Sequence, residues 1–253
     1  MIGKYQASSI TDKSDYASDA EKYPASSFRQ KTEKNSFLFW PLSVSLAIVL
    51  FQLTFKPEAL TNLLLFVGNI LFCSFFVFKS LLVRRKQLLT FQYLSQTLVN
   101  GIFAGLVFWV MLDLILNPVL NNFTGIMTNY EKFNVLRHNI PLTLKATAGV
   151  WLTAAIGEEI IFRGFILEQL TQLTNNRNVS ALLSSLLFSM IHVYQGANGV
   201  VTTFVAGLLF AFLYLRSEKN LLLIILAHGF ADTLFFASVC FNYDSTFLIS
   251  RLF

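Results

Sequence analysis

Charged residues are scarce in this 253-residue sequence: Asp, Glu, Lys and Arg make up 13% of the chain, whereas apolar residues make up 55%. So few charges cannot cover the surface of a water-soluble domain of this length, which excludes that class of protein. Cysteine is also scarce. The two cysteines, Cys73 and Cys240, have neither CxxC nor metal-ligand spacing, and they are interpreted as packing residues.

Two further patterns are absent. The sequence has no short alternating apolar segments of the kind that build an outer-membrane barrel. It also has no basic stripe interleaved with aromatic residues, so the net charge of +5 does not indicate a nucleic-acid partner. The basic residues instead lie beside apolar runs, where they suit a membrane surface, and lipid is the expected partner.

Apolar runs of about 20 residues are what the sequence has in abundance. Such a run can cross roughly 30 Å of hydrocarbon as a helix, so we expect an integral, multi-pass membrane protein with an all-α transmembrane bundle. About seven spans are predicted, with eight as the alternative count. They lie at residues 37–55, 60–82, 93–116, 143–168, 179–195, 198–215 and 220–240.

Four parts are predicted along the chain. Residues 1–35 are polar without an apolar period and are expected to form a disordered tail. Residues 36–140 hold the N-terminal transmembrane helices and an interfacial loop, residues 141–240 a helical core with a polar cavity, and residues 241–253 a C-terminal tail. Basic residues gather in the first tail and at 84–86, which predicts a cytoplasmic N-terminus.

The stretch EEIIFRG, residues 158–164, places three charged side chains inside an apolar run. A carboxylate near the bilayer centre costs about 2.5 to 3.5 kcal/mol on insertion scales, so a chain keeps one for a partner, a wet cavity or a function. Glu159 and Arg163 are four residues apart with the acid first, which favours a pair on one helical face. Glu158 points about 100° away and is the surplus acid.

Two other apolar helices carry ionisable side chains. His192 ends the run ALLSSLLFSMIH, and His228 shares a helical face with Asp232. If the three clusters converge, their carboxylate and imidazoles can activate a water and stabilise an oxyanion. The alternatives are a Glu–Arg pair that only holds helices together and a histidine at the interface. Asp113, near the end of its span without a visible partner, is interpreted as interfacial.

These clusters resemble three motifs of the CAAX protease and bacteriocin-processing family, the membrane-embedded glutamate endopeptidases that include the type II CAAX prenyl endopeptidases. The resemblance covers about residues 145–235, in the family's order on successive apolar helices. The motifs are EExxxR, with Phe before the Arg and Gly after it, at Glu158, Glu159, Phe162, Arg163 and Gly164; FxxxH at Phe188 and His192; and HxxxN, in an Asp variant, at His228 and Asp232.

The resemblance implies a catalytic role for four residues. Glu158 would be the general base that holds the nucleophilic water together with His192, and His228 with Asp232 would steady the oxyanion. Glu159 and Arg163 would orient the site. Many family members carry Asn where this chain has Asp232. An ionised Asp there would repel an oxyanion, so Asp232 is either protonated, as burial in lipid favours, or accepts a hydrogen bond from His228 and holds that ring as a cationic donor, and we expect the second.

No metal cofactor is expected, because the resemblance to structurally understood members favours a metal-free glutamate mechanism. Zinc is the alternative, since two His and a Glu can bind it, and its ligands would then be Glu158, His192 and His228. The HExxH pattern is absent, and these residues lie on three different predicted helices.

The leading hypothesis is an intramembrane endopeptidase that hydrolyses a hydrophobic or lipidated peptide or protein in or beside a membrane. A bacterial plasma membrane is the expected location, which favours peptide maturation or bacteriocin immunity over prenylated substrates. One alternative is a non-catalytic immunity or partner protein that retains the motifs for structure. Another is a proton-coupled transporter, which the lack of an inverted repeat disfavours.

Overall fold

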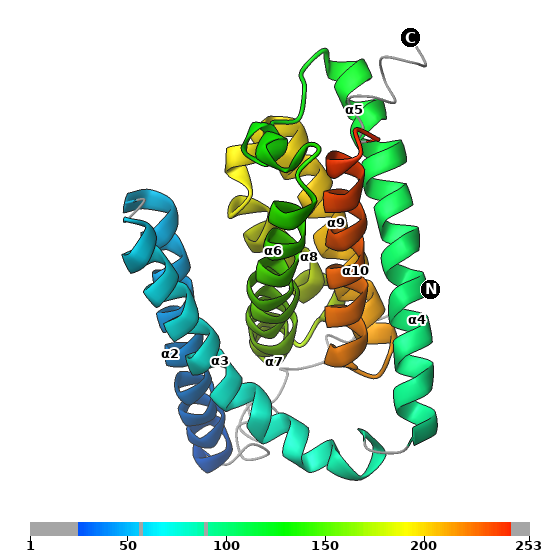
Figure 1. The fold of residues 1–253 in the computed structure, drawn as a ribbon. Coiled ribbons are helices and arrows are strands. Elements are labelled where there is room, and N and C mark those ends of the chain that lie inside the picture. Colours follow the sequence, from blue (N-terminus) through cyan, green and yellow to red (C-terminus); the bar gives the residue numbers. More distant parts are fainter. Residues whose placement is uncertain (1–24, 56–57, 89–90, 244–253) are drawn as a thin grey trace, which may run out of the picture. The chain divides into compact units, whose positions relative to one another are not determined.

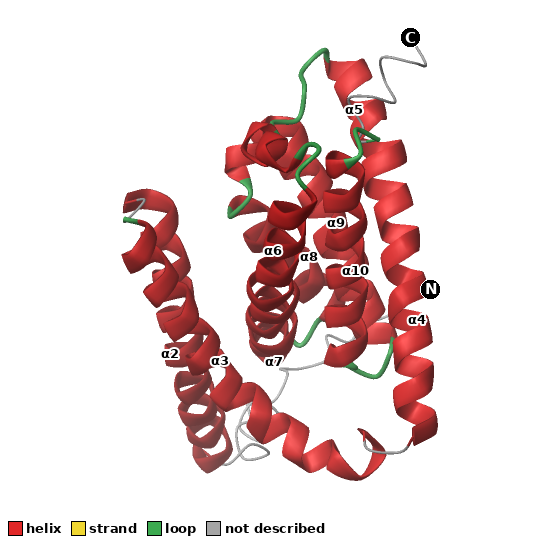
Figure 2. Ribbon diagram, viewed as in Figure 1, coloured by secondary structure: helices red, strands yellow, loops and turns green. Residues whose placement is uncertain are grey.

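A computed structural model describes residues 25–55, 58–88 and 91–243, with side chains at 39–55, 58–78 and 93–243. Every regular element in these ranges is a helix, as Figure 2 shows, so the predicted all-α class is confirmed. In chain order the helices are α2 (Ala25–Phe55), α3 (Ala59–Leu88), α4 (Phe91–Trp109), η1 (Val110–Leu116), α5 (Asn117–Thr124), η2 (Glu131–Leu136), α6 (Ile140–Val150), η3 (Trp151–Glu158), η4 (Ile160–Ile166), α7 (Leu167–Thr174), α8 (Arg177–Met190), η5 (Val193–Gln195), α9 (Gly196–Arg216) and α10 (Leu221–Cys240).

The chain divides into two compact units, residues 1–41 and 42–253. Among its described residues the first unit holds the beginning of α2, and the second holds all the other helices. Because α2 begins at Ala25, residues 25–35 are helical, although the sequence predicts a disordered tail there. The remainder of that predicted tail and residues 244–253 lie outside the described residues.

The helices are long and apolar enough for an integral membrane protein. Four described stretches have the length and composition of a membrane span, and a shorter apolar helix covers Phe39–Phe55. Six of the seven predicted spans lie, to within one residue, on a described helix or on a continuous run of helices, whereas a turn at residues 191–192 interrupts the predicted span 179–195 between α8 and η5. The four stretches do not fix the total, so the count of seven stays a prediction. They are Ala59–Phe78, Tyr93–Thr124, Val193–Arg216 and Leu221–Cys240.

Asparagine side chains begin three of the helices that build the core. Asn139 accepts a hydrogen bond from the backbone N–H of Leu142 at the start of α6, where Pro141 occupies the first turn. Asn176 caps α8 and Asn220 caps α10 in the same way. These caps satisfy backbone groups that lipid cannot hydrogen-bond, so the sequence fixes where each helix begins.

Helices α4 and α10 pack closely because two glycines of α4 face α10; both helices are in Figure 1. A Cβ atom added to Gly101 would lie 2.6 Å from Cβ of Leu226, and one added to Gly105 would lie 2.7 Å from the carbonyl oxygen of Ala227. The spacing GxxxG is typical of close helix approach in membranes. This interface positions α10, which carries His228, against the wall of the bundle.

The core of the second unit is apolar and includes both cysteines. Cys73 and Cys240 are buried and free, so their interpretation as packing residues is confirmed. The largest fully buried side chains, however, include a charged one, Arg163, together with Glu159. Burying such charges is costly unless they are paired and hydrogen-bonded, so their partners define the site.

Candidate active site

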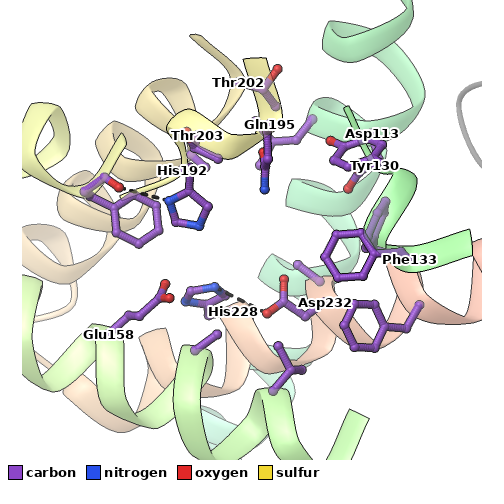
Figure 3. A pocket seen from close by; sticks show the side chains of 18 of the residues that line it. Asp113, Tyr130, Phe133, Glu158, His192, Gln195, Thr202, Thr203, His228 and Asp232 are labelled. Atoms are coloured by element: carbon purple, nitrogen blue, oxygen red, sulfur yellow. Dashed lines mark hydrogen bonds and ion pairs between the residues drawn. The ribbon is translucent and has the colours of Figure 1, made fainter. Parts of the chain in front are cut away.

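The four residues predicted to act together line one cavity of about 300 Å³. Glu158 comes from η3, His192 from the end of α8, and His228 and Asp232 from α10. Figure 3 shows these side chains pointing into the same space. Residues of η1, α9 and the segment between α5 and α6 complete the wall. The three clusters, separated by up to 74 positions in the sequence, therefore meet as expected.

A π-helical geometry surrounds the two glutamates. The run from α6 to α7 is continuous, but η3 and η4 have π-helical turns on either side of Glu159. Such turns are rare and occur frequently at functional sites, because the wider turn changes the direction of the following side chains. Here Glu158, the last residue of η3, lines the cavity, whereas Glu159 is fully buried behind it.

Glu159 is the centre of the buried charges. Its Oε1 atom accepts a hydrogen bond from Nη1 of Arg163 at 2.8 Å, as the i, i+4 spacing predicts. The same oxygen lies 2.7 Å from Nδ1 of His228. The sequence indicates a Glu159–Arg163 pair that neutralises itself. This interpretation is incomplete, because Arg163 shares the carboxylate with His228. The carboxylate of Glu159 thus joins the first motif to the last one.

His228 faces a carboxylate at each ring nitrogen. Its Nδ1 meets Glu159, and its Nε2 lies 3.5 Å from Oδ2 of Asp232. Carboxylate oxygens only accept, so a ring that satisfies both neighbours carries a proton on each nitrogen and is positively charged. The ring of Phe210 stacks on the imidazole with a centroid distance of 4.8 Å and an angle of 24°. Phe210 is a contact that the motifs do not predict.

His192 has the opposite protonation pattern. Its Nδ1 lies 3.0 Å from the carbonyl oxygen of Phe188, the first residue of the FxxxH motif. A carbonyl can only accept, so Nδ1 carries the proton and donates it, which leaves Nε2 as an acceptor in the neutral ring. The ring is partly exposed to the cavity. His192 is therefore arranged to accept a hydrogen bond from a molecule bound there.

Glu158 has unused hydrogen-bonding capacity. Its Oε2 atom is buried and has no hydrogen-bond partner among the described residues. In Figure 3 its carboxylate points towards the two imidazole rings. A buried oxygen without a partner carries a desolvation cost, which a water molecule in the cavity relieves. The surplus acid of the sequence is thus the acid with room for a ligand.

Aromatic rings and a backbone carbonyl surround the guanidinium of Arg163. Its guanidinium carbon lies 4.3 Å from the centroid of Phe188 and 5.2 Å from that of Phe210. Its Nη2 donates to the carbonyl oxygen of Gly207 at 3.4 Å. A Cβ atom on Gly207 would lie 2.9 Å from Cβ of Ser185, so the glycine allows α9 to approach α8, as expected from its small size.

Several cavity residues are not indicated by the motifs. Gln195 is buried, lines the cavity and donates from Nε2 to the hydroxyl of Tyr194 at 3.1 Å. Asp113, interpreted from the sequence as an interfacial residue without a visible partner, also lines the cavity and accepts from Nδ2 of Asn117 at 3.5 Å. An intramembrane acid indicates a functional site by default, and this signal could have placed Asp113. No sequence signal identifies Gln195.

The segment between α5 and α6 closes the cavity on one side. Asn117 donates to the hydroxyl of Tyr130 and accepts from the hydroxyl of Thr128. The backbone N–H of Asn129 donates to the carbonyl oxygen of Gln195 at 2.9 Å. Burial raises the pKa of Tyr130 well above 10, so this phenol stays neutral. The segment is thus fixed to α5 and η5 by hydrogen bonds.

Lys132 lines the cavity from η2. Burial of its ammonium group lowers the pKa of Lys132 from 10.5 to about 8, although the facing carboxylate of Glu158 offsets part of that effect. The ammonium lies over the ring of Tyr194, 3.4 Å from its centroid. Lys132 is therefore charged at neutral pH.

A metal site would need several of these side chains to act as ligands together. Among the described residues, no group of three His, Cys, Asp or Glu is arranged to hold a metal ion. Of the three residues proposed for zinc, His228 has a carboxylate at each nitrogen, which favours protons over a metal there. The donor set therefore does not fit the zinc alternative.

Comparison with known proteins gives one match. Residues 140–234 match the family model described as Type II CAAX prenyl endopeptidase Rce1-like. These residues contain all three motifs and nearly coincide with the segment that carries the resemblance in the sequence. The family prediction is therefore confirmed for this segment. No match was found among the curated proteins or the solved structures.

Proposed function

Because residues 140–234 form an Rce1-like domain, and Rce1-like proteins are a protease family, we propose that this protein is an intramembrane endopeptidase. The observation that carries the proposal is the cavity in which Glu158, His192 and His228 meet within an integral membrane protein. Hydrolysis of a peptide bond needs a base, a bound water and donors for an oxyanion, and the cavity has candidates for each.

In the proposed reaction, a water lies between Glu158 and His192. The unpartnered Oε2 of Glu158 accepts one proton of this water, and Nε2 of His192 accepts a hydrogen bond from the other. As the water attacks the scissile carbonyl, Glu158 takes up the proton and later passes it to the leaving amine. A properly placed general base contributes about 10² to 10⁴ in rate, so this proton transfer is a large part of the proposed catalysis.

In this proposal, His228 stabilises the oxyanion that develops on the scissile carbonyl. Its Nε2–H faces the cavity, while Glu159 holds Nδ1 and stabilises the positive charge of the ring. Asp232 lies 3.5 Å from Nε2, too far for a strong hydrogen bond, so this N–H keeps the capacity to donate to an oxyanion in the cavity. In this proposal Glu159 and Arg163 position His228, and no metal takes part.

The substrate is proposed to be a hydrophobic or lipidated peptide or protein. The cavity walls include aromatic and aliphatic side chains beside the polar ones, for example Phe133, Phe235 and Leu112. An apolar segment entering from the membrane would be desolvated at low cost in such a place. A bacterial plasma membrane, a cytoplasmic N-terminus and a role in bacteriocin immunity or peptide maturation stay predictions.

Cleavage in a reconstituted membrane tests the proposal. Proteoliposomes with the wild-type protein are incubated with a library of apolar and lipidated peptides, and products are identified by mass spectrometry. We expect defined fragments from the wild type and none from Glu158→Ala. Fragments that form equally with Glu158→Ala would contradict the assignment of Glu158. A wild type that binds peptides and leaves all of them intact would favour a non-catalytic partner protein.

A further inference from the structure

Lys132 lies where three hollows of the surface meet. It lines the main cavity together with Glu158, and it also lines two shallower hollows beside that cavity. One of these is formed by Asn129, Glu131, Lys132 and Tyr194. Within the described part of the chain, Lys132 is the one lysine or arginine among the residues that line the main cavity. A substrate entering here therefore passes a single lysine ammonium.

The ammonium of Lys132 is placed by aromatic rings. Its Nζ lies 3.4 Å from the ring centroid of Tyr194 and 4.8 Å from that of Phe133. None of the ion pairs found among the described residues includes Lys132. The titratable groups that face it are Glu158 from η3, Tyr194 from η5 and His192 from the turn before η5, and Glu131 precedes it on η2. Cation–π contact thus fixes the position of the charge and leaves its N–H donors available.

We propose that Lys132 forms a subsite for a carboxylate of the substrate at the mouth of the cavity. This rests on the proposed function, because it assumes that the cavity binds a peptide. One ammonium matches the single negative charge of a carboxylate. A phosphate carries nearly two negative charges at neutral pH, and the facing Glu158 would repel it more strongly. The carboxylate therefore lies in the hollow that Lys132 and Tyr194 line and Glu158 does not.

The location of Lys132 in the sequence supports a role in specificity. Residues 140–234 carry the motifs, whereas Lys132 belongs to the preceding segment, which hydrogen bonds fix over the cavity. The segment thus places a positive charge beside the proposed general base, Glu158, and leaves the motif residues themselves unchanged. The carboxylate can come from two parts of a substrate. One is the C-terminus of a peptide, and the other is the side chain of an Asp or Glu close to the scissile bond.

Binding of four dansyl-labelled hexapeptides of Leu and Ala tests the subsite. One peptide has a free C-terminal carboxylate, one a C-terminal amide, and two are amides with a single internal Asp or Asn. Fluorescence anisotropy measures their affinity for the full-length Glu158→Gln variant in detergent, so that cleavage cannot interfere. The same measurement is made after adding Lys132→Met, Lys132→Arg or Lys145→Met, the last being an exposed lysine of α6 that does not line the cavity.

We expect a carboxylate peptide to bind about tenfold tighter than its neutral counterpart, as for a hydrogen bond to a charged group. Lys132→Met should remove this preference, Lys132→Arg should retain most of it, and Lys145→Met should leave it unchanged. The preference should fall as the pH rises and Lys132 loses its proton. In the Glu158→Gln background this fall should occur below the wild-type pKa of about 8, because the carboxylate that raises the pKa of Lys132 is gone. A merely structural lysine would not give this pH profile.

The peptides also separate the two sources. Preference for the free terminus over the amide assigns a C-terminal carboxylate, and preference for Asp over Asn assigns a side chain. Equal affinity of carboxylate and neutral peptides overturns the proposal, and so does a preference that survives Lys132→Met or disappears with Lys145→Met. If the wild type cleaves no peptide but the preference holds, the proposed protease activity fails and the subsite stands.

Discussion

Nδ1 of His228 lies 2.7 Å from Oε1 of Glu159, and that oxygen also accepts a hydrogen bond from Arg163. One buried carboxylate therefore neutralises an arginine of its own helix and orients a histidine of α10, 69 positions later in the chain. The adjacent carboxylate, Glu158, lines the cavity instead. Two neighbouring acids thus have different environments, because one is enclosed by cations and the other lines the cavity.

Substitution of Glu158 and Asp232 by their amides should separate a base from a supporting group. Glu158→Gln removes the proton acceptor, and we expect cleavage to fall by about 10³-fold. Asp232→Asn should stay within about tenfold of wild type, because the 3.5 Å contact of Asp232 with Nε2 is weak and Glu159 keeps His228 positioned. Initial rates in proteoliposomes measure both. Equal losses in the two variants would sink this division of roles.

Glu159→Gln should destabilise the fold as well as reduce activity. The substitution leaves Arg163 buried without its anion, and breaking a buried ion pair costs about 3 to 5 kcal/mol. Thermal unfolding in detergent measures the loss. Glu168→Gln is the matched control, because it breaks the partly exposed pair with Lys219, worth about 0 to 1 kcal/mol. A control as destabilised as Glu159→Gln would show that burial does not decide the effect.

Removal of metal ions should leave the activity unchanged. The carboxylates beside both nitrogens of His228 favour a protonated ring, which cannot be a ligand. Wild-type protein treated with EDTA and then assayed with and without added zinc measures this directly. Loss of cleavage with the chelator, followed by recovery with zinc, would replace the proposed mechanism with a metal-dependent one.

The sequence predicts the helices and the four cavity residues well, but it does not predict how deep each residue lies. The apolar runs place Glu158 past the middle of span 143–168 and His192 near the outer end of span 179–195. In the structure, Glu158 lies 16 residues before the end of α7, and His192 lies 15 residues after the start of α8. Both counts start from the turn that joins α7 to α8. The two side chains therefore lie at about the same height along the bundle. Apolar patterning locates a span and says little about such a turn.

The sequence also could not predict every partner of the buried charges. Helical spacing gives Glu159–Arg163 and His228–Asp232, because both pairs are local. The contact between Glu159 and His228 depends on the approach of two helices, and the π-helical turns around Glu159 change side-chain directions in a way that no residue type announces. For the same reason the motifs do not indicate Gln195 or Lys132, whose positions depend on how loops pack.

Gly105→Ala should weaken the contact between α4 and α10. The added Cβ would lie 2.7 Å from the carbonyl oxygen of Ala227 and from Cβ of Phe230, so the helices must separate. Overpacking of this kind costs about 1 to 3 kcal/mol. Gly149→Ala is the control, since no atom lies within 4 Å of its added Cβ, and its better helix propensity should stabilise by up to about 1 kcal/mol. Thermal unfolding that ranks the two variants in the opposite order would contradict this packing.

Lys132 should make the stability of the fold depend on pH. Its pKa is about 8 in the folded protein and 10.5 when unperturbed, so between these values the unfolded chain binds more protons. Raising the pH through this window therefore favours the folded state, and wild type should gain stability relative to Lys132→Met from about pH 8 upwards. Unfolding midpoints of both proteins between pH 7 and 9.5 measure the difference, a range below the titration of Tyr130. A wild type that loses stability relative to the variant over this range would mean that the folded protein favours the charged lysine, and the burial assigned to its ammonium would be wrong.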